Sequence, residues 1–594
     1  MHGPHFLDDT RVLFRVWAPF QDQVKLVFDG ENRPRPMTPI CDGFHELICD
    51  DVVPGALYYF QVGDHQRFPD PASRYQPQGV HGPSQLTKLD PYPWQTKNWR
   101  GLKLEELVLY ECHLGCFTQT GTLREAAEQL PYLKKLGINT IALMPIAGFP
   151  GRRNWGYDGV LLYAVPECYG TPRDLQAFVD LAHQQGVAVF LDVVYNHLGP
   201  EGNYFDHFGP YFSKRTTTPW GKALNFDGRD CDPVRAYFLE NARYWLTEYR
   251  IDGLRLDAID DIRDFSVTHL LEELSEMVED VARESGRSII LIGEASTNNP
   301  RWVTPRSRGG IGLHALWDDD LHHAMHAHAT GERTGYYADF GTTAQLVETL
   351  QEGILAPNGY REYRRRRHGK SFAHLADKHQ IVFLQNHDQT GNRPDGKRFH
   401  HLVGIDRTIQ YAALYLISPF VPMLFMGEEY AAEQPFYFFI DYGDAPLIDA
   451  TRKGRKREFK TFGWKGKGTD PQDLKTFAAS RLNLEDHQQG VGARVFSAYQ
   501  TLLAQREIMR KVGLLKKPSK VSHDETHNLI TRRFQNEKAR WVLIVHQGEQ
   551  AVACADLGLT EGHAAFYWAD EQNHTESQET LAPGSTLLWR GSAE

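Results

Sequence analysis

Short apolar or alternating segments separated by turn sequences make up the first hundred residues. Leu13–Trp17, Val24–Phe28 and Ala56–Val62 have the length and the β-branched or aromatic content typical of strands. Turn pairs separate them, namely Asp29-Gly30, Asp42-Gly43 and Pro54-Gly55. This pattern predicts an N-terminal immunoglobulin-like β-sandwich over residues 1–95, and the Pro-rich stretch Pro69–Trp94 is interpreted as a linker lying over the next domain.

From about Leu107 the pattern changes to strands that alternate with helices. Eight short apolar segments are predicted as strands: Leu107–Tyr110, Thr140–Met144, Val187–Val194, Gly253–Asp257, Ile289–Glu294, Gly312–Trp317, Ile381–Asn386 and Pro422–Met426. Amphipathic segments between them are predicted as helices, for example Leu123–Leu136, Pro172–Gln185, Pro233–Tyr249 and Thr268–Arg283. Eight such repeats favour the α/β class, with a (β/α)8 TIM barrel over residues 96–514, rather than an open sheet.

Two regions depart from this alternation. Gly199–Asp230 is rich in Gly, Pro and aromatic residues and has no helical period, so we expect a long excursion after the third barrel strand (about residues 199–230) that shapes a site. After a last helix from Ala493 to about Val512, the segments Asn528–Phe534 and Ala539–His546 again have strand patterns. They predict a C-terminal all-β domain, a second sandwich, over residues 515–594.

Composition and charge exclude several classes of protein. The net charge of −11 leaves no basic surplus to replace phosphate counterions, so we expect no nucleic acid partner. The basic run Arg361–Lys370 is interpreted as a solvated helix face or loop, with a local anion site as the alternative. The N-terminus lacks the pattern of a secretory signal, and no apolar run has the length of a membrane span. We therefore expect no membrane partner and a cytoplasmic protein whose seven scattered cysteines are reduced.

Ionisable side chains gather where four of the predicted strands end. The third strand ends in Asp192–His197 (DVVYNH), the fourth in Arg255–Asp257, the fifth in Glu294 and the seventh in Gln385–Asp388 (QNHD). Each alone has a plain structural explanation, because strand ends meet solvent and an Asp there often caps the next helix. Four such ends at the rim where barrels carry their chemistry favour an active site.

The residue types at this rim narrow the chemistry. The sequence has no GxSxG elbow, no phosphate-binding Gly loop and no HExxH motif. Three carboxylates with His and Arg suit cleavage of a glycosidic bond, in which one carboxylate attacks the anomeric carbon and another protonates the leaving oxygen. Arg255 and Asp257 share one side of their strand, so the guanidinium would keep Asp257 ionised. Glu294 follows the apolar run IILIG, which predicts a raised pKa suited to an acid.

These segments resemble the four signature regions of the α-amylase family of glycoside hydrolases, in the right order: DVVYNH, GLRLDA, LIGEAS and QNHDQ. The resemblance covers essentially the whole chain. It implies a retaining mechanism with Asp257 as nucleophile, Glu294 as general acid/base and Asp388 as the residue that holds the sugar hydroxyls and favours the distorted ring. It also implies that the sugar in the cleaved subsite is surrounded by Tyr157, Asp158, His197, Arg255 and His387.

We expect no cofactor, and no metal site is evident in the sequence. Asn196 can bind calcium in amylase relatives, but the sequence identifies no further ligands. Within the family, the chain is most similar to members that hydrolyse the α-1,4 bond next to the terminal trehalose of maltooligosyltrehalose. The stretches that carry this likeness include NWGYDGV (154–160), DDDLHHAMH (318–326), TGERTGYYADF (330–340), LQNHDQTGNRP (384–394) and MGEEYAAEQPFYFFIDY (426–442). Maltooligosyltrehalose and related α-glucans are therefore the expected substrates.

Trp220, in the excursion, is a candidate contact for the leaving trehalose, and a loop-anchoring aromatic is the alternative interpretation. Three other functions stay open at this point. A 1,4-α-glucan branching enzyme or a general α-glucan hydrolase would use the same carboxylates. A non-catalytic glucan-binding scaffold is the third, and the complete set of Asp257, Glu294 and Asp388 argues against it.

Overall fold

Eight parallel strands close into a barrel at the centre of the computed structural model, which describes residues 2–31, 33–50, 52–63, 66–464, 466–516, 519–559, 561–569 and 579–592. In barrel order they are β10 (Leu109–Cys112), β11 (Thr140–Leu143), β12 (Ala188–Val193), β15 (Gly253–Leu256), β16 (Ile290–Gly293), β17 (Ala315–Trp317), β20 (Gln380–Phe383) and β21 (Val421–Phe425). Each strand overlaps one of the eight predicted segments. The predicted (β/α)8 barrel is therefore confirmed.

Apolar side chains fill the part of the barrel interior nearer the amino ends of the strands. One cluster joins residues from strands all around the barrel, which places it inside: Leu109, Phe190, Ile292, Trp317, Phe383 and Met423 are among its members. Side chains alternate between the two faces of a strand, so the residue two positions further along points to the same side. Glu111, Asp192 and Glu294 stand at such positions. The apolar layer of the interior is thus followed by a polar layer toward the carboxyl ends of the strands.

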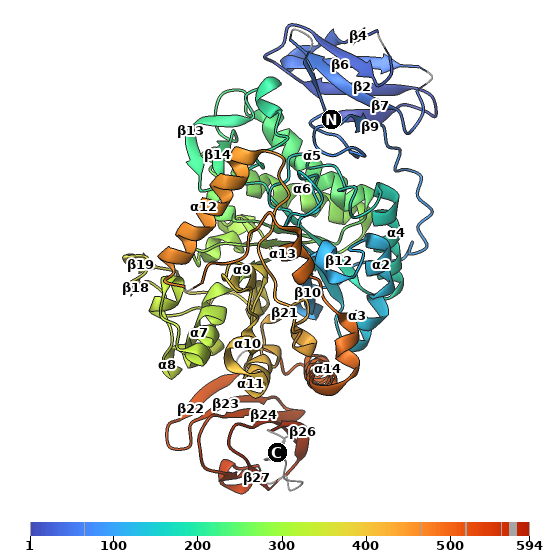
Figure 1. Ribbon diagram of the computed structural model, residues 1–594. Coiled ribbons are helices and arrows are strands. Elements are labelled where there is room, and N and C mark those ends of the chain that lie inside the picture. Colours follow the sequence, from blue (N-terminus) through green and yellow to red (C-terminus); the bar gives the residue numbers. More distant parts are fainter. Residues whose placement is uncertain are drawn as a thin grey trace.

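Helices surround the barrel (Figure 1). They are α1 (Leu114–Phe117), α2 (Leu123–Glu128), α3 (Leu130–Leu136), α4 (Pro172–Gln184), α5 (Asp232–Glu248), α6 (Leu270–Ser285), α7 (Asp319–Thr330), α8 (Thr343–Glu352), α9 (His387–Gly391), α10 (Phe399–Val403), α11 (Ile405–Leu416) and α14 (Gly490–Lys511). The predicted helix Leu123–Leu136 is divided into α2 and α3, because Pro131 has no amide hydrogen to continue the first helix. Within the described ranges, no helix has the length and apolarity needed to span a membrane.

Two further helices, α12 (Ala445–Thr461) and α13 (Leu474–Ala479), follow the last barrel strand. The hydrophobic pattern does not predict α12, because Phe459 is its one buried side chain and it therefore lacks an apolar stripe. Figure 1 shows α12 lying obliquely across the end of the barrel nearest the N-terminal sheets.

β-Sheets flank the barrel at both ends of the chain (Figure 1). The N-terminal sheets have the strand orders β1-β2-β6-β5 and β4-β3-β7-β8, with β9 paired to β7. Their strands are β1 (Gly3–Phe6), β2 (Val12–Trp17), β3 (Val24–Phe28), β4 (Arg35–Pro36), β5 (Thr38–Pro39), β6 (Phe44–Cys49), β7 (Leu57–Val62), β8 (Gln66–Phe68) and β9 (Ser84–Gln85).

The C-terminal sheets lie at the opposite end of the molecule (Figure 1). They have the orders β22-β23-β24-β28-β26 and β25-β27. Their strands are β22 (Lys520–Asp524), β23 (Leu529–Gln535), β24 (Ala539–His546), β25 (Val552–Ala553), β26 (His563–Trp568), β27 (Thr580–Leu581) and β28 (Thr586–Ser592). The boundaries 1–95, 96–514 and 515–594 stay predictions.

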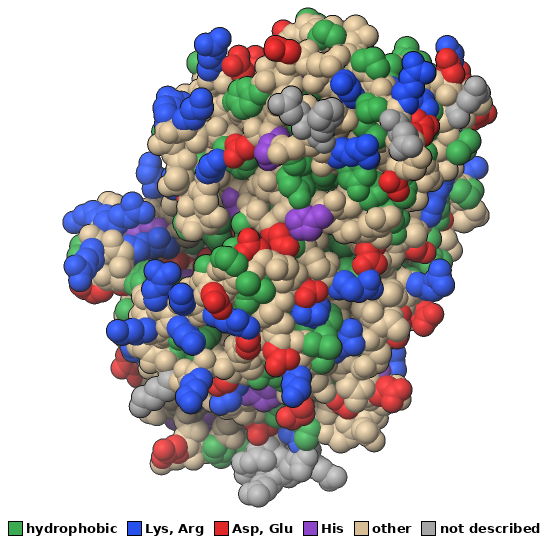
Figure 2. Space-filling model, turned by 45° about the horizontal axis from the view of Figure 1, so that its top comes forward, with side chains coloured by type: hydrophobic (Ala, Val, Ile, Leu, Met, Phe, Trp, Pro, Cys, Tyr) green, Lys and Arg blue, Asp and Glu red, His purple; other side chains and the backbone are tan. Residues whose placement is uncertain are grey.

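Two β-hairpins project from the loops after barrel strands. The excursion contains β13 (Phe212–Thr218) and β14 (Gly221–Leu224), with Trp220 in the turn that joins them. The basic run contributes to a hairpin of β18 (Gly359–Arg361) and β19 (Arg366–His368), so its interpretation as a helix face was wrong, and a solvated loop describes only the turn over residues 362–365. Arg365, with a φ of 49°, adopts the left-handed conformation that such a tight turn needs. Figure 2 shows Lys and Arg side chains gathered on this projection at the left edge of the molecule.

Candidate active site

The carboxyl ends of neighbouring barrel strands bring the predicted acidic residues to one rim. Asp192 lies near the end of β12, Asp257 directly follows β15 and Glu294 directly follows β16. Asp388 lies in the first turn of α9, which begins four residues after β20. In the sheet register, Asp192 is opposite Arg255 and Leu256 is opposite Gly293, so the side chains after these strands face one site.

One guanidinium joins three of the carboxylates. Nη1 of Arg255 lies 2.6 Å from Oδ2 of Asp192 and 3.0 Å from Oδ1 of Asp257, and Nη2 lies 2.6 Å from Oε2 of Glu294. The guanidinium carbon also lies 4.1 Å from the ring centroid of Trp317, which gives Arg255 a flat apolar support. Because one cation faces three carboxylates, the cluster keeps an excess of negative charge.

Asp257 is held through both of its carboxylate oxygens. Oδ1 accepts a hydrogen bond from Arg255, and Oδ2 accepts one from Nδ2 of Asn196 at 2.7 Å. The same amide also donates to the main-chain oxygen of Asp257 at 2.7 Å. These contacts fix the orientation of the carboxylate. Among the described residues, no group of three or more His, Cys, Asp or Glu side chains is arranged to hold a metal ion.

Glu294 lies among other acidic groups. Its Oε2 accepts a hydrogen bond from the main-chain nitrogen of Ala258 at 3.0 Å. Burial raises the pKa of Glu294 well above its ordinary value; the charge of Arg255 opposes this rise, and the charges of Asp257, Asp388 and Asp319 add to it. The direction agrees with the sequence expectation for an acid. The pKa of Asp192 is shifted in the same direction: burial raises it to about 6 despite the contact with Arg255.

His387 and Asp388 begin α9, which follows the seventh barrel strand, β20. Oδ1 of Asp388 accepts a hydrogen bond from Nδ2 of Asn392 at 3.0 Å, and its Oδ2 lies 3.5 Å from Nε2 of His387. The His387 ring stacks on Tyr157 with centroids 5.1 Å apart. The Asp388 side chain is 39% exposed, the largest exposure in the proposed catalytic set, which leaves it open to a ligand.

The other predicted substrate contacts lie in the loops after the second and third barrel strands, β11 and β12. The Tyr157 hydroxyl donates to Oδ2 of Asp192 at 2.7 Å, which joins it to the carboxylate cluster. Asp158 accepts from Nδ2 of Asn154 at 2.6 Å. The His197 ring stacks on Trp220 with centroids 5.1 Å apart, and burial lowers the pKa of His197. Trp220 itself is 51% exposed, so its other face is free to meet a ligand.

Four residues of this rim are absent from the set predicted by sequence: Glu111, Asp192, Asn196 and Asp319. Asp192 and Asn196 belong to the motif DVVYNH, which could have identified them, since both contact a predicted site residue. Burial and the charge of Asp388 raise the pKa of Asp319 to about 7, which shows that Asp319 faces the same negatively charged space. Glu111 is a single acid in an apolar strand and contacts His387.

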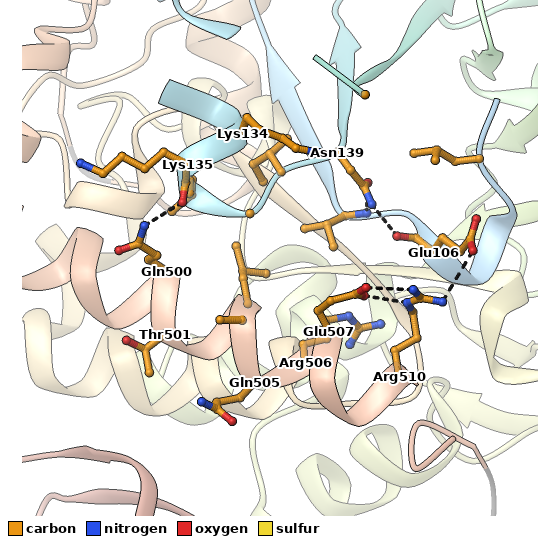
Figure 3. A pocket seen from close by; sticks show the side chains of 18 of the residues that line it. Glu106, Lys134, Lys135, Asn139, Gln500, Thr501, Gln505, Arg506, Glu507 and Arg510 are labelled. Atoms are coloured by element: carbon orange, nitrogen blue, oxygen red, sulfur yellow. Dashed lines mark hydrogen bonds and ion pairs between the residues drawn. The ribbon is translucent and has the colours of Figure 1, made fainter. Parts of the chain in front are cut away.

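A separate cavity of about 790 Å³ lies at the other end of the barrel, between α3 and α14 (Figure 3). Its charged walls pair with one another, since Arg510 contacts both Glu507 and Glu106. Asn139 and Gln500 likewise donate to main-chain oxygens of the cavity wall. This cavity lies at the amino ends of the barrel strands, where residues support the fold rather than chemistry.

Comparisons with known proteins agree with the barrel fold. The family model for the α-amylase catalytic domain matches residues 92–220. Malto-oligosyltrehalose trehalohydrolase of Saccharolobus solfataricus is 43% identical over 514 residues, which cover 86% of this chain and 87% of the relative. A solved structure from Salmonella typhimurium, assigned to the alpha amylases, is 37% identical with a TM-score of 0.89 and covers 100% of this chain and 99% of its own. A 1,4-alpha-glucan branching enzyme of Bacillus caldolyticus is 31% identical over 387 residues, 59% of this chain and 57% of that enzyme.

Proposed function

Since this chain belongs to the malto-oligosyltrehalose trehalohydrolases of the α-amylase family, we propose that it hydrolyses the α-1,4-glucosidic bond next to the terminal trehalose of maltooligosyltrehalose. Trehalose and a shorter maltooligosaccharide are the products. The observation that carries the chemistry is the Arg255 guanidinium, which contacts both Asp257 and Glu294 and so holds two carboxylates at one reaction centre.

In the first step, Asp257 attacks the anomeric carbon of the sugar that precedes the trehalose. The carbon–oxygen bond to the trehalose breaks, and the proton of Glu294 passes to the leaving oxygen. A β-glycosyl ester on Asp257 and free trehalose result. Arg255 and Asn196 hold Asp257 in a fixed orientation, which reduces the entropy lost on the way to the transition state.

In the second step, water replaces the trehalose. Glu294, now ionised, removes a proton from the water as the oxygen bonds to the anomeric carbon, and the ester bond to Asp257 breaks. The ester has removed the negative charge of Asp257 that raises the pKa of Glu294, and Arg255 remains in contact. Glu294 is therefore more acidic in this intermediate, which suits its change from acid to base.

Substrate-binding roles follow from the positions around this centre. We assign the sugar of the cleaved subsite to Tyr157, Asp158, His197, Arg255 and His387, with Asp388 binding the hydroxyl groups of the distorted ring. Trp220 stacks on His197 at the mouth of the site and is assigned to the leaving trehalose. No residue role in this scheme requires a cofactor or a metal.

A branching enzyme is the second candidate within the family, and it shares the carboxylate set. Its reaction would transfer the glycosyl group from Asp257 to a sugar hydroxyl rather than to water and would create α-1,6 bonds. The match to the branching enzyme is 31% identical and covers 59% of this chain, whereas the match to the trehalohydrolase is 43% identical and covers 86%. This difference favours the hydrolase.

Proton NMR of the reaction with maltopentaosyltrehalose tests the proposal. We expect free trehalose and, before mutarotation, a new reducing end in the α configuration, because two displacements retain the anomer. The variant Asp257→Asn serves as the control for contaminating activity. A β reducing end would contradict the role of Asp257 as nucleophile, and α-1,6 signals would favour a transferase.

A further inference from the structure

Glu111 is a buried carboxylate inside the barrel that the mechanism above does not use. It belongs to β10, is 2% exposed, and shares with Leu109 the side of the strand that faces the interior. Both of its oxygens contact His387: Oε1 lies 2.7 Å from Nδ1 of the ring, and Oε2 accepts a hydrogen bond from the main-chain nitrogen of His387 at 2.9 Å. Glu111 thus fixes both the ring and the backbone at the start of α9.

The charged groups around His387 come from several elements. Nε2 lies 3.5 Å from Oδ2 of Asp388, while Arg255 on β15 opposes a positive charge on the ring. His113, after β10, also faces it, but burial lowers the pKa of His113 to about 4, so it is neutral. Aromatic side chains also pack against the ring, since Tyr157 stacks on one face and Trp155 meets it edge-on.

These contacts determine the protonation of the ring. An ionised carboxylate only accepts hydrogen bonds, so Nδ1 must carry a hydrogen toward Glu111. Burial lowers the pKa of His387, but the charges of Asp388 and Glu111 and the hydrogen bond to Glu111 outweigh it and raise the pKa to about 9. With Nδ1 donating to Glu111, a second proton on Nε2 faces Asp388 and the open site. The ring is therefore an imidazolium at neutral pH.

We propose that Glu111 is a positioning residue that keeps His387 doubly protonated, so that Nε2–H faces Asp388 and donates to the sugar hydroxyl that Asp388 also binds. This inference rests on the proposed function, because the sugar of the cleaved subsite is the ligand of both residues. A neutral His387 that donates Nδ1–H to residue 111 presents a lone pair at Nε2. It then repels the Asp388 carboxylate and loses a charge-assisted hydrogen bond to the substrate.

The variant Glu111→Gln tests the proposal, since glutamine keeps the shape and an acceptor but removes the charge. We expect the ratio of wild-type to variant kcat on maltopentaosyltrehalose to be about tenfold larger at pH 8.5 than at pH 5.5, because low pH restores the proton to His387. A ratio that does not change with pH would overturn the proposal. The effect is expected in kcat more than in KM, because the hydrogen bond from the imidazolium to the sugar hydroxyl becomes stronger as the sugar ring distorts.

Two matched variants test whether the charge of Glu111, rather than the loss of any buried carboxylate, causes the effect. Glu111→Asp keeps the charge and is expected to show a ratio that is nearly constant with pH. Glu429→Gln removes another buried carboxylate next to β10, where Glu429 accepts a hydrogen bond from Tyr110, without touching His387. Any loss it causes should be the same at both pH values. A pH-dependent ratio equal to that of Glu111→Gln in this control would contradict the proposal.

The ring itself gives a readout that does not depend on catalysis. Nitrogen-15 NMR of the wild-type protein should show both nitrogens of His387 protonated at pH 7.5 and a titration at about pH 9. In Glu111→Gln the titration should move down by more than about one pH unit. A neutral ring in the wild type at pH 7.5 would overturn the inference. Failure of the wild type to release trehalose would overturn only the proposed function, since the ring titration still decides the role of Glu111.

Discussion

Nη2 of Arg255 lies 2.6 Å from Oε2 of Glu294, so the proposed acid forms an ion pair inside its own active site. The contact favours the ionised carboxylate, while burial and the charge of Asp257 favour the protonated one. The balance between these opposing effects on the pKa of Glu294 changes during the reaction, because the glycosyl ester removes the charge of Asp257. Arg255 therefore links the protonation of the acid to the covalent state of the nucleophile.

The variant Arg255→Lys tests this link. Lysine keeps the charge but cannot contact Asp257 and Glu294 with two nitrogens at once. A lost hydrogen bond between charged groups is worth about 1.5–3 kcal/mol, so we expect kcat/KM to fall about 10- to 100-fold. Circular dichroism should show an unchanged fold. Arg243→Lys is the matched control, because Arg243 forms an exposed ion pair with Glu284 far from the site, and it should leave turnover unchanged. Turnover near the wild-type value in Arg255→Lys would contradict the role given to this residue.

The Glu111–His387 pair predicts how stability depends on pH. The folded state raises the pKa of His387 from 6.5 to about 9, so the folded protein holds a proton that the unfolded chain releases between these values. The contribution is fully present below about pH 6.5 and is lost as the pH rises through about 9, with an upper limit on the order of 3 kcal/mol. Thermal unfolding should therefore show that Glu111→Gln destabilises the protein more at pH 6 than at pH 9.5. An effect that grows with pH would contradict this assignment.

Trp220 tests how the leaving trehalose is recognised. Its side chain is 51% exposed and stacks on His197, so one face of the ring is available to a sugar. Aromatic contacts are worth about 0.5–1.5 kcal/mol, so Trp220→Ala should lower kcat/KM for maltooligosyltrehalose about 2- to 10-fold more than for a plain maltooligosaccharide. Trp220→Phe keeps an aromatic face and should lose less. An equal loss on both substrates would mean that Trp220 only supports the hairpin.

The sequence predicts the barrel well, because its strands are short apolar runs between clear helices. It predicts the first strand less well. The predicted segment Leu107–Tyr110 ends before Glu111, whereas β10 runs from Leu109 to Cys112. The main-chain nitrogen of Val108 donates to Oδ1 of Asn139, a partner that no local pattern reveals. The contact between Glu111 and His387 joins residues 276 positions apart and could not be predicted either.

The predicted acidic residues meet at one rim because the register of a closed barrel is regular, and strand ends in sequence become neighbours in space. The interpretation of the basic run as a helix face was wrong because the sequence does not show which of its charges are buried. Its charges suggested a solvated helix face, but Arg361 is buried and donates to the main-chain oxygens of Leu355 and Ala356, which anchors one strand of a hairpin. A buried arginine of this kind is indistinguishable from a surface one in the sequence.

Substrate choice is the central claim and has one direct measurement. The kcat/KM for maltopentaosyltrehalose should be compared with that for maltohexaose under the same conditions, with trehalose quantified as a product of the first. The account predicts a clear preference for maltopentaosyltrehalose, because residues beyond the cleaved bond recognise the α,α-1,1 link of the leaving group. Equal values of kcat/KM for the two substrates would contradict the trehalohydrolase function and leave a general α-glucan hydrolase.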